Sequence, residues 1–210
     1  MAKSNPPVKI KICGMTNLDD ARLAVENGAD AVGFIFYKKS PRCVTEKTVK
    51  EINAQLPPFI HRVGVFVNET AERINRIAAS CGLSAVQLHG DESPAFCRKI
   101  KSRVIKAVRV ENAASLKNLS RYPVDGFLLD TFKKGQWGGT GQVFDWALAK
   151  RAKQYGAVIV AGGLNSRNVR EAIRRVQPYG VDVSSGVERS PGIKDPKKIK
   201  AFLKAVREGQ

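Results

Sequence analysis

Eight short runs of apolar residues recur along the chain at regular intervals, and this regularity restricts the fold more than any other feature. The runs start 19 to 32 residues apart and are rich in Val and Ile. Their apolar character is nearly continuous, which is typical of parallel strands that are buried on both faces. The predicted strands are residues 8–13, 31–36, 63–67, 85–89, 104–108, 126–130, 157–161 and 181–185.

Segments with the apolar spacing of helices lie between these runs, and most of them begin with residues typical of a helix start. Side chains that accept hydrogen bonds from backbone N–H groups favour this position, as does proline in the first turn. The predicted helix starts are Asn17, Thr45, Asn68, Ser93-Pro94 and Asp195-Pro196. Three further helices are predicted from spacing at 113–119, 146–152 and 169–176.

Eight strand–helix units in 210 residues predict an α/β fold, the (β/α)8 TIM barrel, at the small end of its size range. An open doubly wound sheet is the alternative, but eight units without a break in composition favour a closed barrel. No linker divides the chain, so we expect a single domain over residues 1–210, with residues 1–7 as a flexible N-terminal tail. In such barrels the active site lies where the strands end.

Composition restricts the cellular setting and the partners. No apolar run reaches the roughly 18 residues of a membrane span, and no secretory signal opens the chain, so we expect a cytoplasmic protein without a membrane partner. The four cysteines lack the spacing of a zinc site, and no metal is expected. The net charge of +17 attracts anions. Because the basic residues are scattered and no nucleic-acid-binding motif occurs, they favour an anionic metabolite over nucleic acid.

Glycines and hydroxyl groups stand at the ends of the last two predicted strands. The residues are Gly162, Gly163, Ser184, Ser185 and Gly186. Loops at these two places in a barrel often bind phosphate through backbone N–H groups, and glycine lets an anion approach the backbone closely. Tight turns alone would also explain the glycines. The two sets together predict a phosphorylated small-molecule substrate.

Four side chains with useful chemistry stand at other strand ends: Cys13, Arg42, His89 and Asp130. Cys13 is either a base or nucleophile, if its thiolate is stabilised, or an inert core residue. Asp130 follows a buried run, where a carboxylate is costly unless it has a function or caps the next loop. Arg42 suits a carboxylate or phosphate but equally a surface ion pair. His89 is either an acid–base group or a hydrogen-bonded structural residue.

With these residues placed, the sequence resembles the phosphoribosylanthranilate isomerase family of tryptophan biosynthesis. The resemblance covers about residues 8–208, and no catalytic position departs from the family pattern, although Met15 and Cys43 vary mildly. Its most specific part is DVSSGVE at 182–188 followed by SPGIKD at 190–195. The other matching motifs are KICGMT (11–16), GFIF (33–36), SPR (40–42), GVFVN (64–68), QLHGD (87–91), LDT (129–131), GGTG (138–141), FDW (144–146) and AGGL (161–164).

The resemblance implies an Amadori rearrangement of N-(5-phosphoribosyl)anthranilate to 1-(2-carboxyphenylamino)-1-deoxy-D-ribulose 5-phosphate, without metal or cofactor. It implies that Cys13 is the general base and Asp130 the general acid. It also implies that Arg42 holds the anthranilate carboxylate and that Asp182 contacts the sugar. The phosphate would bind at the glycine and serine positions named above. We expect a monomer or a homodimer.

Two other classes remain open from the residues alone. Another phosphosugar barrel, such as an indole-glycerol-phosphate synthase or a metal-dependent pentose-phosphate epimerase, would need catalytic Lys and Glu residues or several His ligands. This chain has Cys13 and Asp130 at the strand ends and only two histidines. The second class is a barrel that binds nucleic acid through its positive charge, which salt-dependent DNA binding without turnover would support.

Overall fold

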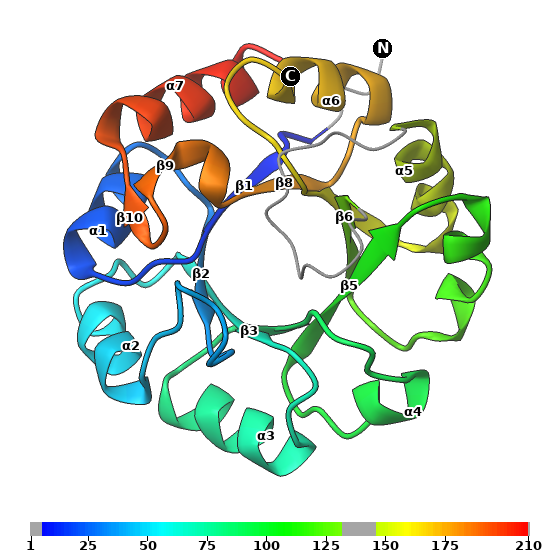
Figure 1. Cartoon of the computed structure of the whole chain (residues 1–210), viewed down its shortest axis with the longest axis horizontal. Helices are drawn as coiled ribbons and strands as arrows, with labels where there is room; N and C mark the ends of the chain where they lie inside the picture. Colours follow the sequence, from blue (N-terminus) through cyan, green and yellow to red (C-terminus); the bar gives the residue numbers. More distant parts are fainter. Residues whose placement is uncertain (1–5, 132–145, 210) are drawn as a thin grey trace.

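Eight parallel strands close into a barrel in chain order, and β8 pairs back to β1 (Figure 1). The computed structural model describes residues 6–131 and 146–209. The strands are β1 (Lys9–Cys13), β2 (Ala31–Ile35), β3 (His61–Phe66), β4 (Ala85–Leu88), β5 (Arg103–Val110), β6 (Gly126–Thr131), β7 (Ala157–Val160) and β8 (Gly180–Val183). The prediction of a (β/α)8 TIM barrel is therefore confirmed.

Helices form an outer ring around the strands (Figure 1). They are α1 (Leu18–Glu26), α2 (Glu46–Asn53), α3 (Ala71–Ser80), α4 (Pro94–Cys97), α5 (Trp146–Ala152), α6 (Val169–Val176) and α7 (Pro196–Arg207). Short 3-10 turns are η1 (Ala113–Leu116), η2 (Leu119–Arg121), η3 (Lys153–Tyr155) and η4 (Ser185–Val187). No helix within the two described stretches is long and apolar enough to cross a membrane.

Most helix starts lie where the capping residues predicted them. Asn17 accepts a hydrogen bond from the backbone N–H of Asp20 at 2.8 Å, and Asp195 accepts from Lys197 and Lys198. The prediction at Asn68 was wrong, because Thr70 caps α3. Asn68 instead adopts a left-handed backbone conformation with φ 50° and accepts from the Asp91 N–H at 2.7 Å, so it serves the neighbouring loop.

The α-helix predicted at 113–119 is also absent, and two 3-10 turns replace it. Asn112 and Ser115 hydrogen-bond reciprocally across the first turn, which closes it after four residues. Asn118 then leaves helical geometry at φ −107° and ψ 7°. Side chains of Asn and Ser compete with helical hydrogen bonds in this way.

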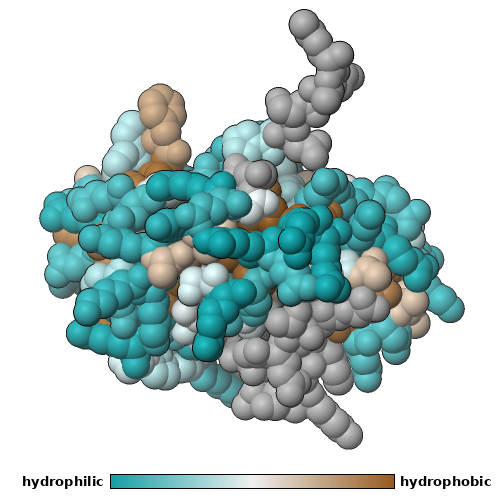
Figure 2. Space-filling model, turned by 90° about the horizontal axis from the view of Figure 1, so that it is seen from above, coloured by the Kyte–Doolittle hydropathy of each residue, from teal (hydrophilic) through white to brown (hydrophobic). Residues whose placement is uncertain are grey.

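The main core lies between the strands and the helices. Alternate strand residues such as Ile12, Phe34 and Val181 point outward into it and are fully buried. Burial of each such side chain stabilises the fold by about 1.5–3 kcal/mol. The opposite positions of the strands point into the barrel, where a smaller apolar cluster includes Leu128 and Ile159. Figure 2 shows that the visible outer face is mainly hydrophilic.

A hairpin that the sequence did not predict follows β8. It consists of β9 (Glu188–Ser190) and β10 (Ile193–Lys194), which pair in antiparallel orientation. Gly192 turns the chain with φ 85°, a conformation that favours glycine. The hairpin lies beside α1 and the carboxyl end of β1 (Figure 1), so it brings late residues of the chain to the first strand.

Parts of the predictions lie outside the described residues. These are residues 1–5 of the expected tail, the motif at 138–141 and the first two residues of the motif at 144–146.

Candidate active site

A cavity opens at the carboxyl ends of the barrel strands and gathers nearly all of the predicted site residues. Those that line it are Cys13, Arg42, His89, Asp130, Gly162, Gly163, Asp182, Ser184 and Ser185. Gly186 is not among the lining residues, and a Cβ atom there would collide with the carbonyl oxygen of Leu164. The close approach of two backbones therefore requires glycine at 186.

The loops after β7 and β8 have the features of an anion site. Gly162 and Gly163 both adopt positive φ angles, 77° and 66°. The side-chain amides of Asn165 and Asn168 donate to the Gly163 carbonyl oxygen, which fixes the orientation of this turn. In the neighbouring loop after β8, the buried Ser184 hydroxyl has no hydrogen-bond partner among the described residues. This hydroxyl group is therefore not committed to another group of the described residues.

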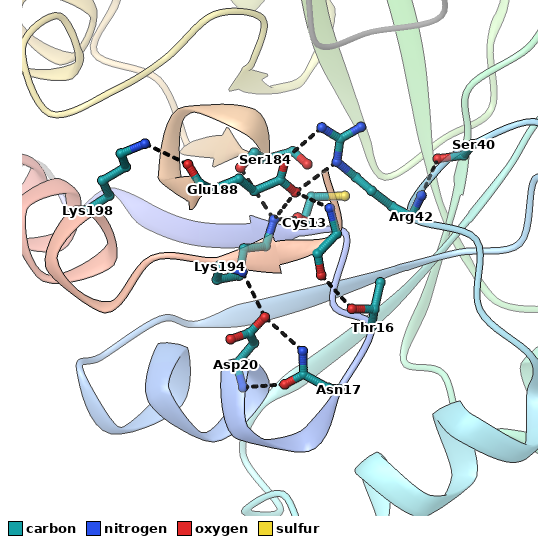
Figure 3. Close-up of polar contacts among 11 residues, drawn as sticks. Cys13, Thr16, Asn17, Asp20, Ser40, Arg42, Ser184, Glu188, Lys194 and Lys198 are labelled. Carbon is teal, nitrogen blue, oxygen red and sulfur yellow. Dashed lines mark hydrogen bonds and ion pairs between the residues drawn. The ribbon is translucent and has the colours of Figure 1, made fainter. Parts of the chain in front are cut away.

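Arg42 is held from one side by a buried carboxylate (Figure 3). Its Nε and Nη2 atoms donate to the two Glu188 oxygens at 2.8 and 2.6 Å, and its pKa is raised mainly by this hydrogen bonding. Nη1 makes no hydrogen bond or ion pair within residues 6–131 and 146–209. The guanidinium group therefore keeps one edge for a ligand while the other edge fixes its position.

Lys194 from β10 connects this pair to the end of β1 (Figure 3). Its fully buried ammonium group donates to Glu188 Oε1 at 2.9 Å and to the carbonyl oxygens of Cys13 and Ser184 at 2.5 and 3.3 Å. Burial lowers the pKa of Lys194, although the Glu188 carboxylate opposes the shift. The backbone N–H of Lys194 donates to Asp20 in α1. Lys194 thus ties the end of β1 to the loop that carries Ser184.

The Cys13 thiol is buried at the end of β1. A Cβ atom at position 33 would lie 2.7 Å from its sulfur, so Gly33 in β2 makes room for the thiol. Burial raises the pKa of Cys13 above its ordinary value, and the ammonium groups of Lys11 and Lys194 only partly oppose this shift. Cys13 is therefore a thiol near neutral pH, with cations at hand to stabilise a thiolate.

Asp130 lies near the carboxyl end of β6, on a different strand of the cavity wall. One of its oxygens, Oδ2, lies 3.3 Å from His89 Nε2. The other ring nitrogen of His89 contacts the Gln87 amide at 2.8 Å. Both Asp130 and Gln87 are buried.

Asp182 is paired inside the barrel. Its Oδ1 accepts a hydrogen bond from Lys11 Nζ at 3.0 Å, and both side chains are almost inaccessible to solvent. Burial by itself lowers the pKa of Lys11, but the charges of Asp182 and Cys13 outweigh this and leave it raised. The sequence placed Asp182 against the sugar and gave no role to Lys11.

Sequence reasoning missed four residues of this site: Lys11, Gln87, Glu188 and Lys194. Lys11 and Gln87 stand two positions before Cys13 and His89 in buried strands. Because strand side chains alternate between faces, these polar residues had to point into the barrel with the site residues, and this spacing could have revealed them. Glu188 and Lys194 come from the hairpin, for which the sequence carries no comparable period.

A barrel whose open end gathers a thiol, a carboxyl group and glycine-rich loops is typical of enzymes that act on small phosphorylated metabolites. Within that class, the family model described as N-(5'phosphoribosyl)anthranilate (PRA) isomerase matches residues 10–205. The chain belongs to this family. It is an isomerase of tryptophan biosynthesis that carries out the Amadori rearrangement.

Known relatives agree over nearly the whole chain. An N-(5'-phosphoribosyl)anthranilate isomerase of Pelobacter propionicus is 52% identical over 201 residues, which is 96% of each protein. The crystal structure of phosphoribosyl anthranilate isomerase from Thermotoga maritima is 47% identical with a TM-score of 0.89, covering 96% of this chain and 99% of that one. Another structure of the Thermotoga protein describes monomers generated from a dimeric enzyme, with 44% identity, a TM-score of 0.86 and the same coverage.

A further solved structure contains a ligand. It is a phosphoribosyl anthranilate isomerase in complex with reduced 1-(o-carboxyphenylamino)-1-deoxyribulose 5-phosphate. It is 46% identical to this chain with a TM-score of 0.85, covering 96% of this chain and 99% of that one.

Proposed function

We propose that this chain performs its rearrangement with Cys13 as general base and Asp130 as general acid. The observation that carries the proposal is their common position on one cavity, at the ends of β1 and β6. Cations lie beside the thiol and a histidine lies beside the carboxyl group. An acid and a base on separate strands can act on opposite sides of one bound sugar.

The chemistry needs two proton transfers. Asp130 gives a proton to the furanose ring oxygen as the bond from this oxygen to C1′ breaks, and the nitrogen lone pair forms an iminium ion. Cys13, as thiolate, removes the proton on C2′. The electron pair of the broken C2′–H bond forms a C1′–C2′ double bond, while the iminium nitrogen becomes neutral. The resulting enolamine takes up a proton at C1′ and loses the proton of its hydroxyl group, which gives the ketone.

The substrate's two ends bind at separate anchors in this proposal. The phosphate lies against Gly162, Gly163, Ser184, Ser185 and Gly186, where an unpartnered hydroxyl and two left-handed glycines support an anion site. The anthranilate carboxylate takes the remaining edge of Arg42. The charges of Arg42, Glu188 and Lys194 sum to one positive charge, which suits one carboxylate. Asp182, while paired with Lys11, lines the cavity at the sugar.

We also propose that the cytoplasm is the site of this activity and that the protein forms a homodimer through the amino-terminal mouth of the barrel. Phe59 is 95% exposed there. It lines a second cavity together with Val63, Ile105 and Tyr179. Phe59 and the exposed Tyr179 line the same cavity, and a joint apolar patch of this kind supports an interface between two copies. Light scattering of the parent and of Phe59→Ser would test the dimer, and a monomeric parent would overturn it. Cell fractionation would test the compartment.

Loss of substrate fluorescence, followed with purified variants, tests the acid–base assignment. Cys13→Ser keeps the shape but removes an ionisable thiol, and Asp130→Asn removes the donated proton. We expect kcat to fall by about two to four decades in each variant. KM should change little, because the phosphate and carboxylate anchors remain.

The exposed Cys43 provides a matched control, since Cys43→Ser changes the same atom outside the cavity lining. Circular dichroism would confirm that each variant is folded. If Cys13→Ser kept a kcat within about threefold of the parent, the general-base assignment would be wrong. The double variant should lose less than the sum of the single losses in free energy, because both groups serve one reaction sequence.

A further inference from the structure

A line of five polar side chains crosses the interior of the barrel and ends at the proposed acid. It runs from Asp182 on β8 to Lys11 on β1, Gln87 on β4, His89 just after β4 and Asp130 on β6. The four successive contacts measure 3.0, 2.9, 2.8 and 3.3 Å. All five side chains are buried or nearly so.

Lys11 decides which way the Gln87 amide faces. An ammonium group can only donate hydrogen bonds, so the Gln87 atom that contacts Lys11 Nζ must be the carbonyl oxygen Oε1. The Gln87 amide nitrogen then faces His89 Nδ1 at 2.8 Å. Lys11 is itself held in place by Asp182, so the orientation of Gln87 is fixed from behind.

Gln87 in turn decides which ring nitrogen of His89 carries the proton. An amide nitrogen donates and does not accept, so His89 Nδ1 must accept. The ring proton of the neutral imidazole therefore sits on Nε2, the nitrogen 3.3 Å from Asp130 Oδ2. This last contact does not meet the geometry of a hydrogen bond, and such contacts commonly align when substrate binds.

We propose that Lys11 and Gln87 fix His89 as its Nε2–H tautomer, and that His89 is thereby a positioning residue that donates to Asp130 Oδ2. This inference rests on the proposed role of Asp130 as the acid. A donor at Oδ2 favours the acid's proton on the other oxygen, Oδ1. As that proton passes to the substrate, Nε2–H stabilises the negative charge that develops on the carboxylate, and His89 itself transfers no proton.

Nitrogen NMR of protein labelled in its histidine rings tests the tautomer directly. The chain has only two histidines, and His61 at the exposed start of β3 serves as an internal control. In the full-length protein at neutral pH we expect a protonated Nε2 and a bare, accepting Nδ1 for His89. A proton on Nδ1 of His89 in the parent protein would overturn the inference.

Gln87→Glu provides the matched perturbation. It keeps the length of the side chain and an acceptor for Lys11, but it presents an oxygen instead of an N–H group to His89. We expect Nδ1 of His89 to gain a proton in this variant while the His61 signals stay unchanged. The inference would be wrong if the protonation of Nδ1 were the same in the variant and the parent.

Kinetics separate a positioning role from a structural one. His89→Leu removes the donor, and we expect kcat to fall by about tenfold to a hundredfold while KM stays within about threefold. His89→Gln keeps an N–H group near the position of Nε2 and should recover part of this loss. His61→Gln should leave both constants unchanged. A folded His89→Leu variant with the parent's kcat would overturn the positioning role.

The two proposals fail separately. If Asp130→Asn retained its kcat, the acid assignment and the positioning role would fall, while the tautomer measured by NMR would stand. If the NMR showed a proton on His89 Nδ1 in the parent, the present inference would fall and the acid–base assignment of Cys13 and Asp130 would be untouched.

Discussion

Replacement of Glu188 by glutamine should destabilise the fold more than its small change in shape suggests. The Glu188 carboxylate is buried and accepts hydrogen bonds from both Arg42 and Lys194. Glu188→Gln keeps the size and one acceptor but leaves two cations without a counter-charge. Lys194 is fully buried and Arg42 is 17% exposed, so water screens only the second of them appreciably.

The expected cost follows from these burials. Removal of one partner from a buried ion pair costs about 3–5 kcal/mol. Because the amide retains one acceptor, we expect the lower end, about 3 kcal/mol. For a chain of this length each kcal/mol lowers Tm by about 2–4 °C, so Tm should fall by about 6–12 °C.

The cost should also depend on pH. Burial alone would raise the pKa of Glu188, but hydrogen bonding from Arg42 and the charge of Lys194 outweigh it and hold the pKa below the ordinary value of 4.5. A carboxyl group with a lowered pKa in the folded state stabilises the fold above its unfolded pKa and loses this contribution as the pH falls through the folded pKa. The difference between parent and variant should therefore be full near pH 7 and shrink in acid below about pH 4.5.

Urea unfolding at neutral and acid pH measures both quantities. Glu51→Gln is the matched control, because Glu51 forms an exposed pair with Lys47 and its replacement should change stability by less than about 0.5 kcal/mol. If Glu188→Gln unfolded at the parent's urea concentration at pH 7, the ion-pair argument would be refuted. A difference that stayed constant into acid would refute the charge as its cause.

Three further outcomes are expected of the site. Arg42→Ala should raise KM by about one to two decades with little change in kcat, because the guanidinium group binds a charged end of the substrate; an unchanged KM with a collapsed kcat would place Arg42 in the chemistry. The kcat/KM should rise with pH from about 6 to 9, because burial raises the pKa of Cys13 and more thiolate forms as the pH rises; a flat profile would contradict a thiolate base. Turnover should survive EDTA, since no group of metal-ligating side chains occurs in the described part of the chain; loss on chelation that a divalent ion restores would contradict this.

The fold was predictable because its signal is local and repeated. A continuous apolar run indicates each buried parallel strand. Side chains such as Thr45 and Asp195 indicate helix starts, because they accept hydrogen bonds from nearby backbone N–H groups. The errors fall where tertiary contacts overrule the local signal. Asn68 has the side chain of a helix cap, but its Oδ1 atom accepts a hydrogen bond from the backbone N–H of Asp91 in a different loop.

The site was predictable where a residue ends a strand. Cys13, Asp130 and the paired glycines lie at the carboxyl ends, and the barrel topology alone brings them to one cavity. The spacing of Lys11 and Gln87 in their strands could have revealed them, but the partners from the hairpin were not predictable. Glu188 and Lys194 reach the cavity through a hairpin turn, so nothing in their sequence spacing relates them to Arg42 or Cys13.

The hairpin has a consequence for how the enzyme becomes active during its synthesis. Cys13 leaves the ribosome 181 positions before Lys194, which binds its carbonyl oxygen. A nascent chain that ends before β10 has already made both proposed proton-transfer groups but lacks the cation that joins the first strand to the last loop. We therefore expect full activity only after Lys194 has been made, because its ammonium group joins the end of β1 to the loop after β8.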